Sequence, residues 1–374
     1  MRWPTGMAAT REALVLSLFA YVSLVPFYAP NASAAVKYLP FALAMAAICL
    51  GLWNTLRQQI HVDTTLLMLV GCHLVAGAAS LLNARYADIG AAKLIYFSVT
   101  GPLLLFAVGS FGMEAVARTA RGLAAVGVTA TLYGLGVWIS SSGGHLLGIL
   151  GHHSVNGTYI AALLPIIWIS VRISFRGSDY RWLSWGSIFT LLPALFLTFS
   201  RGAWLASMAG GVTLWRHRPK AVGVDRVRIA GVVSLLILAW ALLDRSDLAI
   251  LRHSGVTDAL RRTWTKTMRF EQADAHRLQQ WHTTGRVLDE YPALGLGFGN
   301  FTRGFDDYSE KVGKGVTART TDNMYLMVAC ETGIAGLCVF LGLMGYLGRG
   351  LWRAAATDTG LATAIFASFT TLTV

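Results

Sequence analysis

Eleven apolar runs divide this chain, and most approach the roughly 20 residues that a helix needs to cross a bilayer. A composition of 55% apolar and only 13% charged residues also differs from that of ordinary water-soluble domains. We therefore predict an all-α polytopic membrane protein with about 11–12 transmembrane helices and one large external loop that contains amphipathic helices. The apolar runs cover residues 13–28, 35–53, 64–82, 92–113, 122–139, 155–171, 183–200, 202–215, 229–243, 324–347 and 360–374.

The first and last runs lead to expectations about the ends of the chain. Ala32-Ser33-Ala34, after the first run, has the small-x-small form of a signal-peptidase site. Because many spans follow, we favour an uncleaved first helix over a cleaved signal peptide. The last run continues to Val374, so we expect a truncated chain and a twelfth helix beyond it.

Lysine and arginine residues indicate the orientation, because cytoplasmic loops of membrane proteins carry most of them. With the N-terminus inside, fifteen of the 31 lie in inner connections, and 12 lie in the segment 245–320, which is too long for this rule. The four in short outer connections are Lys37, Arg85, Lys93 and Arg201. We therefore expect helices 1–9 over residues 1–244, an external loop over 245–320 and helices 10–11 over 321–374.

The net charge of +12 is spread between the apolar runs instead of forming one patch, which argues against a nucleic-acid partner. The lipid bilayer is the expected partner. Cys49, Cys72, Cys330 and Cys338 lie inside apolar runs at spacings that fit neither a metal site nor a disulfide framework. We interpret them as small buried hydrophobes.

The long loop carries a helical pattern followed by a glycine-rich turn. Leu278, Trp281, Gly285 and Leu288 recur at helical spacing, and Pro292 ends the pattern. This predicts a half-buried helix that lies on the membrane surface or packs over the bundle. The glycines of residues 295–300 follow no strand, so turns and close backbone contacts explain them better than a dinucleotide site.

Three cationic residues could bind an anionic substrate. Arg201 stands between two apolar runs with almost no loop, where it must either reach lipid headgroups or meet another anion. Lys93 opens an apolar run on the same side, and a lysine that extends towards the membrane surface explains it as well. Together with Arg277 in the loop helix, these residues could bind one diphosphate, because the arginine fork bonds phosphate oxygens in pairs.

The border between the loop and the tenth run offers candidates for acid–base chemistry. Asp322 could accept a proton from a hydroxyl, whereas a helix N-cap formed by Thr321, Asp322 or Asn323 explains the same residues without chemistry. Glu331 lies deeper in the run, where an acid is costly, so we expect it to face the bundle interior with a partner, for instance a backbone group.

The histidines show no metal-ligand spacing with carboxylates or thiols, so we expect no metal and no cofactor. His276 and His282 remain reserve candidates for the base. The other clustered histidines are His145, His152 and His153.

Four motifs, in order, resemble those of the O-antigen ligase and O-antigen polymerase superfamily of bacterial inner-membrane proteins. They are Ser200-Arg201-Gly202, Arg277 with Trp281, the turn Pro292–Phe301, and Asp322-Asn323-Met324-Tyr325-Leu326 followed by Glu331-Thr332-Gly333-Ile334-Ala335-Gly336. Lys93 and Asn156 match more weakly, by position and residue type. The strong resemblance covers residues 183–337.

The resemblance implies a multi-pass protein of the bacterial inner membrane with a periplasmic loop and a periplasmic active site. It implies metal-independent transfer of a glycan from undecaprenyl diphosphate to an acceptor hydroxyl on lipid A-core, another glycan or another molecule. Arg201 and Arg277 would hold the diphosphate with help from Lys93, and Asp322 would act as the base. Asn156, Trp281, Asn323, Tyr325 and Glu331 are the expected substrate-binding residues.

One departure affects the acceptor. Ligases of this superfamily typically have histidine where this chain has Asp322, which favours a polymerase, or a ligase for another polysaccharide or a protein. A flippase or transporter without bond chemistry is a competing function, and it would show internally repeated broken helices that we do not find in the sequence. A structural protein whose loop docks a partner is a third possibility.

Overall fold

The structure, a computed structural model, describes residues 45–46, 48–49, 53, 63–98, 127–138, 146, 153–174, 181–217, 270–301, 323–357 and 360–373. The secondary structure of this part is helical, as expected for the fold class. The apolar runs 13–28 and 229–243, and most of 35–53, lie outside the described residues. The elements are α3 (Thr64–Ser80), η2 (Leu81–Asn83), α4 (Ala87–Ser98), α7 (His153–Ser174), α8 (Arg181–Leu197), α9 (Arg201–Arg216), α12 (Phe270–Glu290), α14 (Met324–Ala356), α15 (Gly360–Thr373) and a helix over residues 127–138.

The chain forms two compact units that interleave in sequence. The first unit comprises Met1–Leu43, Phe111–Met268 and Gly348–Val374. The second comprises Ala44–Ser110 and Arg269–Leu347.

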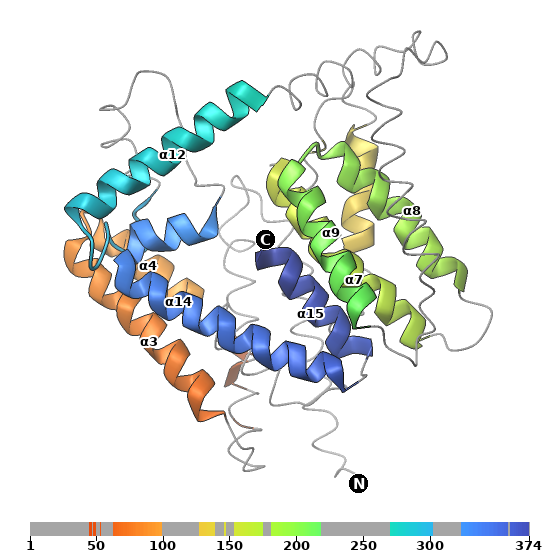
Figure 1. Cartoon of the computed structure of the whole chain (residues 1–374), viewed down its shortest axis with the longest axis horizontal. Helices are drawn as coiled ribbons and strands as arrows, with labels where there is room; N and C mark the ends of the chain where they lie inside the picture. Colours follow the sequence, from red (N-terminus) through yellow and green to blue (C-terminus); the bar gives the residue numbers. More distant parts are fainter. Residues whose placement is uncertain are drawn as a thin grey trace. The chain divides into compact units, whose positions relative to one another are not determined.

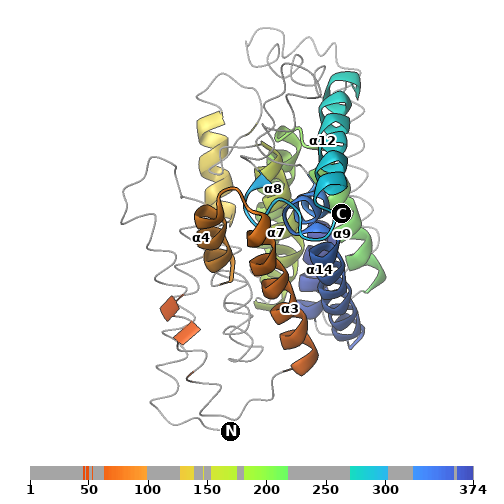
Figure 2. The same cartoon turned by 90° about the vertical axis from the view of Figure 1, so that its left-hand side faces the viewer.

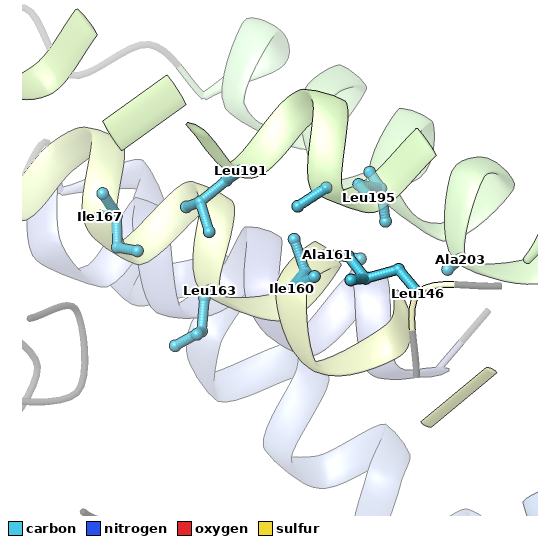
Figure 3. Packing of buried hydrophobic residues seen from close by; sticks show 9 residues of the cluster. Leu146, Ile160, Ala161, Leu163, Ile167, Leu191, Leu195 and Ala203 are labelled. Atoms are coloured by element: carbon cyan, nitrogen blue, oxygen red, sulfur yellow. The ribbon is translucent and has the colours of Figure 1, made fainter. Parts of the chain in front are cut away.

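In the first unit, α7 packs against α8, α9 and α15 around an apolar core (Figure 3). Small residues allow close approach: a Cβ atom on Gly210 of α9 would lie 2.3 Å from Oγ1 of Thr371 on α15. Packing of this kind is typical of helices in membranes, where no hydrophobic effect drives them together. The core residues are Leu146, Ile160, Ala161, Leu163, Ile167, Leu191, Ala194, Leu195 and Ala203.

In the second unit, α3, η2 and α4 form a short helical hairpin, visible in Figure 2. Asp63 caps α3 by accepting hydrogen bonds from the N–H groups of Thr65 and Leu66. The other oxygen of the same carboxylate accepts from the hydroxyl of Tyr346 in α14 at 2.5 Å. The start of α3 is thereby tied to the far part of α14.

Helix α14 is bent at Gly333, whose φ of +67° and ψ of −170° are not helical. Figure 1 shows two limbs that meet at a corner. The rings of Tyr325 and Phe340, one on each limb, lie 6.0 Å apart between centroids, although 15 residues of straight helix would separate them by roughly 22 Å. The expected run 324–347 is therefore not one straight helix.

Two helical stretches in the described part are long and apolar enough to cross a membrane, Thr64–Asn83 and Met324–Ala356. The second limb of α14 alone, residues 334–356, extends roughly 34 Å, which exceeds the thickness of a bilayer core of about 30 Å. Shorter apolar stretches are Asn156–Ile167, Ile188–Leu197 and Ala362–Thr373.

The interpretation of the cysteines as buried hydrophobes holds for Cys330 and is wrong for Cys49, Cys72 and Cys338, which are exposed. The physical reason is that an apolar helix in a bilayer need not bury its apolar residues in protein, because lipid tails serve equally well. The exposed Leu67, Met68 and Val75 of α3 fit the same explanation.

Candidate active site

The glycine-rich turn Pro292–Phe301 is held between several helices of the second unit. Three of its glycines have positive φ angles: +66° at Gly295, +98° at Gly297 and +71° at Gly299. Residues with a Cβ atom rarely adopt these angles. A Cβ atom on Gly297 would also lie 2.4 Å from the Cβ atom of Ala84. The prediction of turns with close backbone contacts is confirmed.

The turn is joined through its backbone to the corner of α14. Gly333 interrupts the helix there, so nearby carbonyl and N–H groups lose their usual helical partners. The turn supplies replacements. The three main-chain bonds run from Leu296 N–H to the Cys330 carbonyl at 2.8 Å, from Gly297 N–H to the Glu331 carbonyl at 3.1 Å and from Ile334 N–H to the Pro292 carbonyl at 2.9 Å.

Polar side chains join the turn to the α3–α4 hairpin. The Ser80 hydroxyl accepts a hydrogen bond from the Phe298 N–H at 2.9 Å. The Asn300 amide both accepts from the Tyr86 N–H at 3.1 Å and donates to the Tyr86 carbonyl at 3.3 Å. Our sequence analysis did not single out Ser80 or Asn300. For Ser80 the only available signal was a polar residue near the end of an apolar run, and for Asn300 it was a place in the predicted glycine-rich turn.

Two expected site residues, Lys93 and Glu331, also contact this turn. The Lys93 ammonium donates to the carbonyl of Gly299 at 2.5 Å. The Glu331 side chain is only 9% exposed, and its carboxylate accepts from the N–H of Phe301 at 3.3 Å. The prediction that Glu331 has a backbone partner is confirmed, whereas its role in substrate binding stays a prediction.

The first limb of α14 begins at Asn323. The side-chain oxygen of this residue accepts from the N–H groups of Tyr325 and Leu326 at 2.9 and 3.1 Å, so Asn323 is the N-cap. Asp322, the expected base, lies outside the described residues. Because Asn323 is the N-cap, α14 does not need Asp322 for capping.

Helix α12 is confirmed, but the face that it buries differs from one of our two expectations. Leu278 and Trp281 are 54% and 55% exposed, so they do not lie on the face that α12 buries. The buried face instead carries Gln280, Thr283, Thr284 and Val287. The expectation that an apolar helix face packs against protein assumes that water surrounds the protein. A helix at a membrane surface can instead direct Trp281 towards lipid. Arg277 lies in the same helix, one turn before Trp281.

In the first unit, Ser200 and Arg201 form the start of α9. Phe199 has a positive φ of +52°, which turns the chain sharply between α8 and α9. The Ser200 hydroxyl caps α9 by accepting from the Ala203 N–H at 3.4 Å. Arg201 is the first helical residue and is partly exposed. Its charge is thereby added to the partial positive charge of a helix N-terminus, an arrangement that favours anions.

The start of α7 packs against the same turn. A Cβ atom on Gly157 would lie 2.9 Å from Oγ1 of Thr198, so α7 approaches this turn closely. The neighbouring Asn156 is buried and donates to the Leu146 carbonyl at 3.5 Å. One turn further along α7, the buried hydroxyl of Tyr159 has no hydrogen-bond partner among the described residues. Our sequence analysis missed Tyr159, since nothing distinguishes it from a core aromatic residue.

The predicted site residues that the structure describes are divided between the two units. The first unit holds Arg201 and Asn156, and the second holds Lys93, Trp281, Asn323, Tyr325 and Glu331. Within the described part of the chain, no group of three His, Cys, Asp or Glu side chains could hold a metal ion.

Residues 186–341 match a family model described as O-antigen ligase. This region is similar to the O-antigen ligase family. The match bears out the resemblance found in the sequence motifs, and its limits agree closely with the expected 183–337. No curated protein matches the chain.

The O-antigen ligase region includes the start of α9, all of α12, the glycine-rich turn and the corner of α14. Lys93 and Asn156 lie outside it, in keeping with their weaker match. Enzymes of this family are glycan-transferring proteins of the O-antigen ligase and polymerase type, and they reside in the inner membrane. Their partners are, in general, a lipid-linked glycan and an acceptor.

Proposed function

We propose that this protein transfers a glycan from undecaprenyl diphosphate to an acceptor hydroxyl at the periplasmic face of the inner membrane. The observation that carries the proposal is the O-antigen ligase match over residues 186–341, which contains most of the candidate residues. The two alternatives are a repeat-unit polymerase and a flippase.

The diphosphate is assigned to Arg201 and Arg277. Arg201 stands at a helix N-terminus, where exposed N–H groups add to its charge. Arg277 on α12 is the second ligand, and Lys93 assists.

Asp322 is proposed as the general base. It precedes the cap residue Asn323 at the entrance to α14, close in sequence to Tyr325. The acceptor oxygen attacks C1 of the first sugar, its proton passes to Asp322, and the bond from C1 to the phosphate oxygen breaks. Undecaprenyl diphosphate then leaves with its negative charge stabilised by the arginines.

The remaining candidates are proposed to shape the site. Lys93 and Glu331 hold the glycine-rich turn in place through Gly299 and Phe301. Trp281 is exposed on α12, as a residue that stacks on a sugar or lipid must be. Asn156 and Tyr325 are proposed contacts to the glycan.

The test uses purified protein, a lipid-linked glycan and an acceptor glycan in detergent micelles. Replacement of Arg201 or Arg277 by alanine should lower the rate of undecaprenyl diphosphate release about a hundredfold or more, since each removes charge stabilisation of the leaving group. Arg286→Ala is the matched control, because Arg286 is exposed on α12 and lies half a helical revolution from Arg277. Wild-type rates in both Arg201→Ala and Arg277→Ala would refute the assignment.

The polymerase alternative is favoured by one observation, the presence of Asp322 where ligases typically have histidine. A polymerase would release undecaprenyl diphosphate only when the acceptor is itself a lipid-linked repeat. A ligase would also accept lipid A-core or another final acceptor. A flippase would release none with any acceptor.

A further inference from the structure

The end of α9 and the end of α14 meet in the first unit, at the opposite end of α9 from Arg201. Arg216 lies 15 residues beyond Arg201, which corresponds to roughly 22 Å of helix. The rings of His217 and Trp352 contact each other with centroids 4.4 Å apart and planes at 82°. Phe366 of α15 packs against the rings of both residues at 5.5 and 5.7 Å. Three helices therefore fix the position of Trp352.

Arginine and tryptophan side chains surround this contact. The guanidinium carbon of Arg216 lies 5.6 Å from the centre of the Trp352 ring. On α14, Arg349 is three residues before Trp352 and four before Arg353, so these side chains neighbour one another on the helix surface. All three arginines are exposed, and so are Trp215 and Trp352, at 48% and 45%. We call Trp215, Arg216, Arg349, Trp352 and Arg353 the basic-aromatic strip.

The positive charge of this strip is not balanced within the described part of the first unit. Residues 127–138, 153–174, 181–217, 348–357 and 360–373 contain no aspartate or glutamate. Neighbouring arginines repel each other, and a nearby anion relieves that repulsion. A phosphate diester suits them, because the guanidinium fork pairs with two phosphate oxygens.

We propose that the basic-aromatic strip binds the headgroup of an anionic phospholipid. Two features favour a lipid over an acidic protein. The strip lies where the apolar stretches of α9 and α14 end, which is where headgroups are located. Exposed tryptophans beside arginines are also typical of a membrane–water interface, where the indole ring contacts lipid and its N–H remains near water. The proposed binding of a phospholipid headgroup does not depend on the proposed glycan transfer.

The experiment measures which lipids the full chain retains. Protein from nanodiscs with equal amounts of phosphatidylglycerol and phosphatidylcholine is examined by native mass spectrometry. The wild type should retain phosphatidylglycerol preferentially, and the double variant R349Q/R353Q should lower the ratio of the two retained lipids roughly tenfold, given the contribution of each arginine near a charged surface. R349K/R353K keeps the charge and should retain most of the preference.

A matched control is R85Q/R286Q, which removes two exposed arginines of the second unit. It should keep the wild-type lipid ratio. Equal losses in R349Q/R353Q and R85Q/R286Q would mean that total charge and not the strip selects the lipid, and the proposal would be overturned. No preference in the wild type would also overturn it and would leave an acidic protein segment as the partner. Thermal unfolding in zwitterionic detergent verifies that each variant is folded.

Discussion

At the scale of single residues, glycine controls the geometry of the candidate site. Gly333 bends α14, and a Cβ atom at this position would lie 2.2 Å from the carbonyl oxygen of Ala293. In the same way, a Cβ atom added to Gly295 would lie 2.3 Å from the carbonyl oxygen of Cys330 in α14. Two backbones thus approach each other where side chains would prevent it.

Gly333→Ala should destabilise the protein by roughly 1–3 kcal/mol, because alanine resists a φ of +67° and its methyl group would displace Ala293. Gly345→Ala is the matched control in the same limb, since nothing lies within 4 Å of its Cβ position. That change should be neutral or stabilise by about 0.5–1 kcal/mol. Thermal unfolding in detergent measures both, and equal effects would contradict the account of the bend.

His217 provides a prediction about pH. Burial, with the nearby charge of Arg216, lowers the pKa of His217 below its ordinary value. A histidine with a lowered folded-state pKa contributes stability above the unfolded-state pKa of about 6.5 and loses it as the pH falls from there. The melting temperature should therefore fall more between about pH 7.5 and pH 5.5 in the wild type than in His217→Gln. Identical pH dependence in both proteins would show that His217 contributes nothing.

At the scale of elements, the glycine-rich turn joins the α3–α4 hairpin to the corner of α14. Ser80→Ala removes the acceptor for the Phe298 N–H, and Asn300→Ala removes two bonds to Tyr86. Each change should weaken the turn by about 1–2 kcal/mol, since a buried donor or acceptor loses its partner. Hydrogen exchange of the amides in residues 295–301 should accelerate in both variants. Thr357→Ala, at the exposed end of α14, should leave these amides unchanged.

The sequence predicts these elements better than it predicts their contacts. Apolar runs locate α3, α7, α8, α9 and α15 to within a few residues, because burial in lipid or protein requires continuous apolar surface. The bend at Gly333 leaves no trace in the hydrophobic pattern, since the run is apolar on both sides of it. The hydrogen bond between Ser80 and Phe298 joins residues 218 positions apart, and no local pattern encodes such a pairing.

The sequence predicts those features of the candidate site that follow from the charge of a residue or from a motif. Glu331 was expected to have a partner because an isolated buried acid is costly, and it has one. Lys93 was expected to serve a diphosphate, but its bond to the Gly299 carbonyl depends on folding that hydropathy does not describe. The buried polar face of α12 was missed for the same reason.

At the scale of the whole molecule, orientation across the membrane is the main prediction. In a variant without native cysteines, Asp88→Cys at the start of α4 should react with a membrane-impermeant maleimide added to spheroplasts. Arg353→Cys at the end of α14 should react only after the inner membrane is opened, because lysine and arginine place that end in the cytoplasm. Both residues are exposed, so a lack of access through burial does not explain a difference. The reverse pattern would invert the topology and move the candidate site to the cytosol.

The long separation between the turn and its partners also has a consequence for biosynthesis. Ser80 and Asn300 are made 220 positions apart, so at about 5–20 residues per second the hairpin emerges from the ribosome roughly 10–40 seconds before the turn. During this interval the Ser80 hydroxyl can still donate to the Gly77 carbonyl of its own helix, whereas Lys93 must find a temporary partner in water, lipid or the insertion machinery. A cell that stalls translation between these segments would hold a partly assembled protein, and quality-control proteases would encounter the hairpin without its turn.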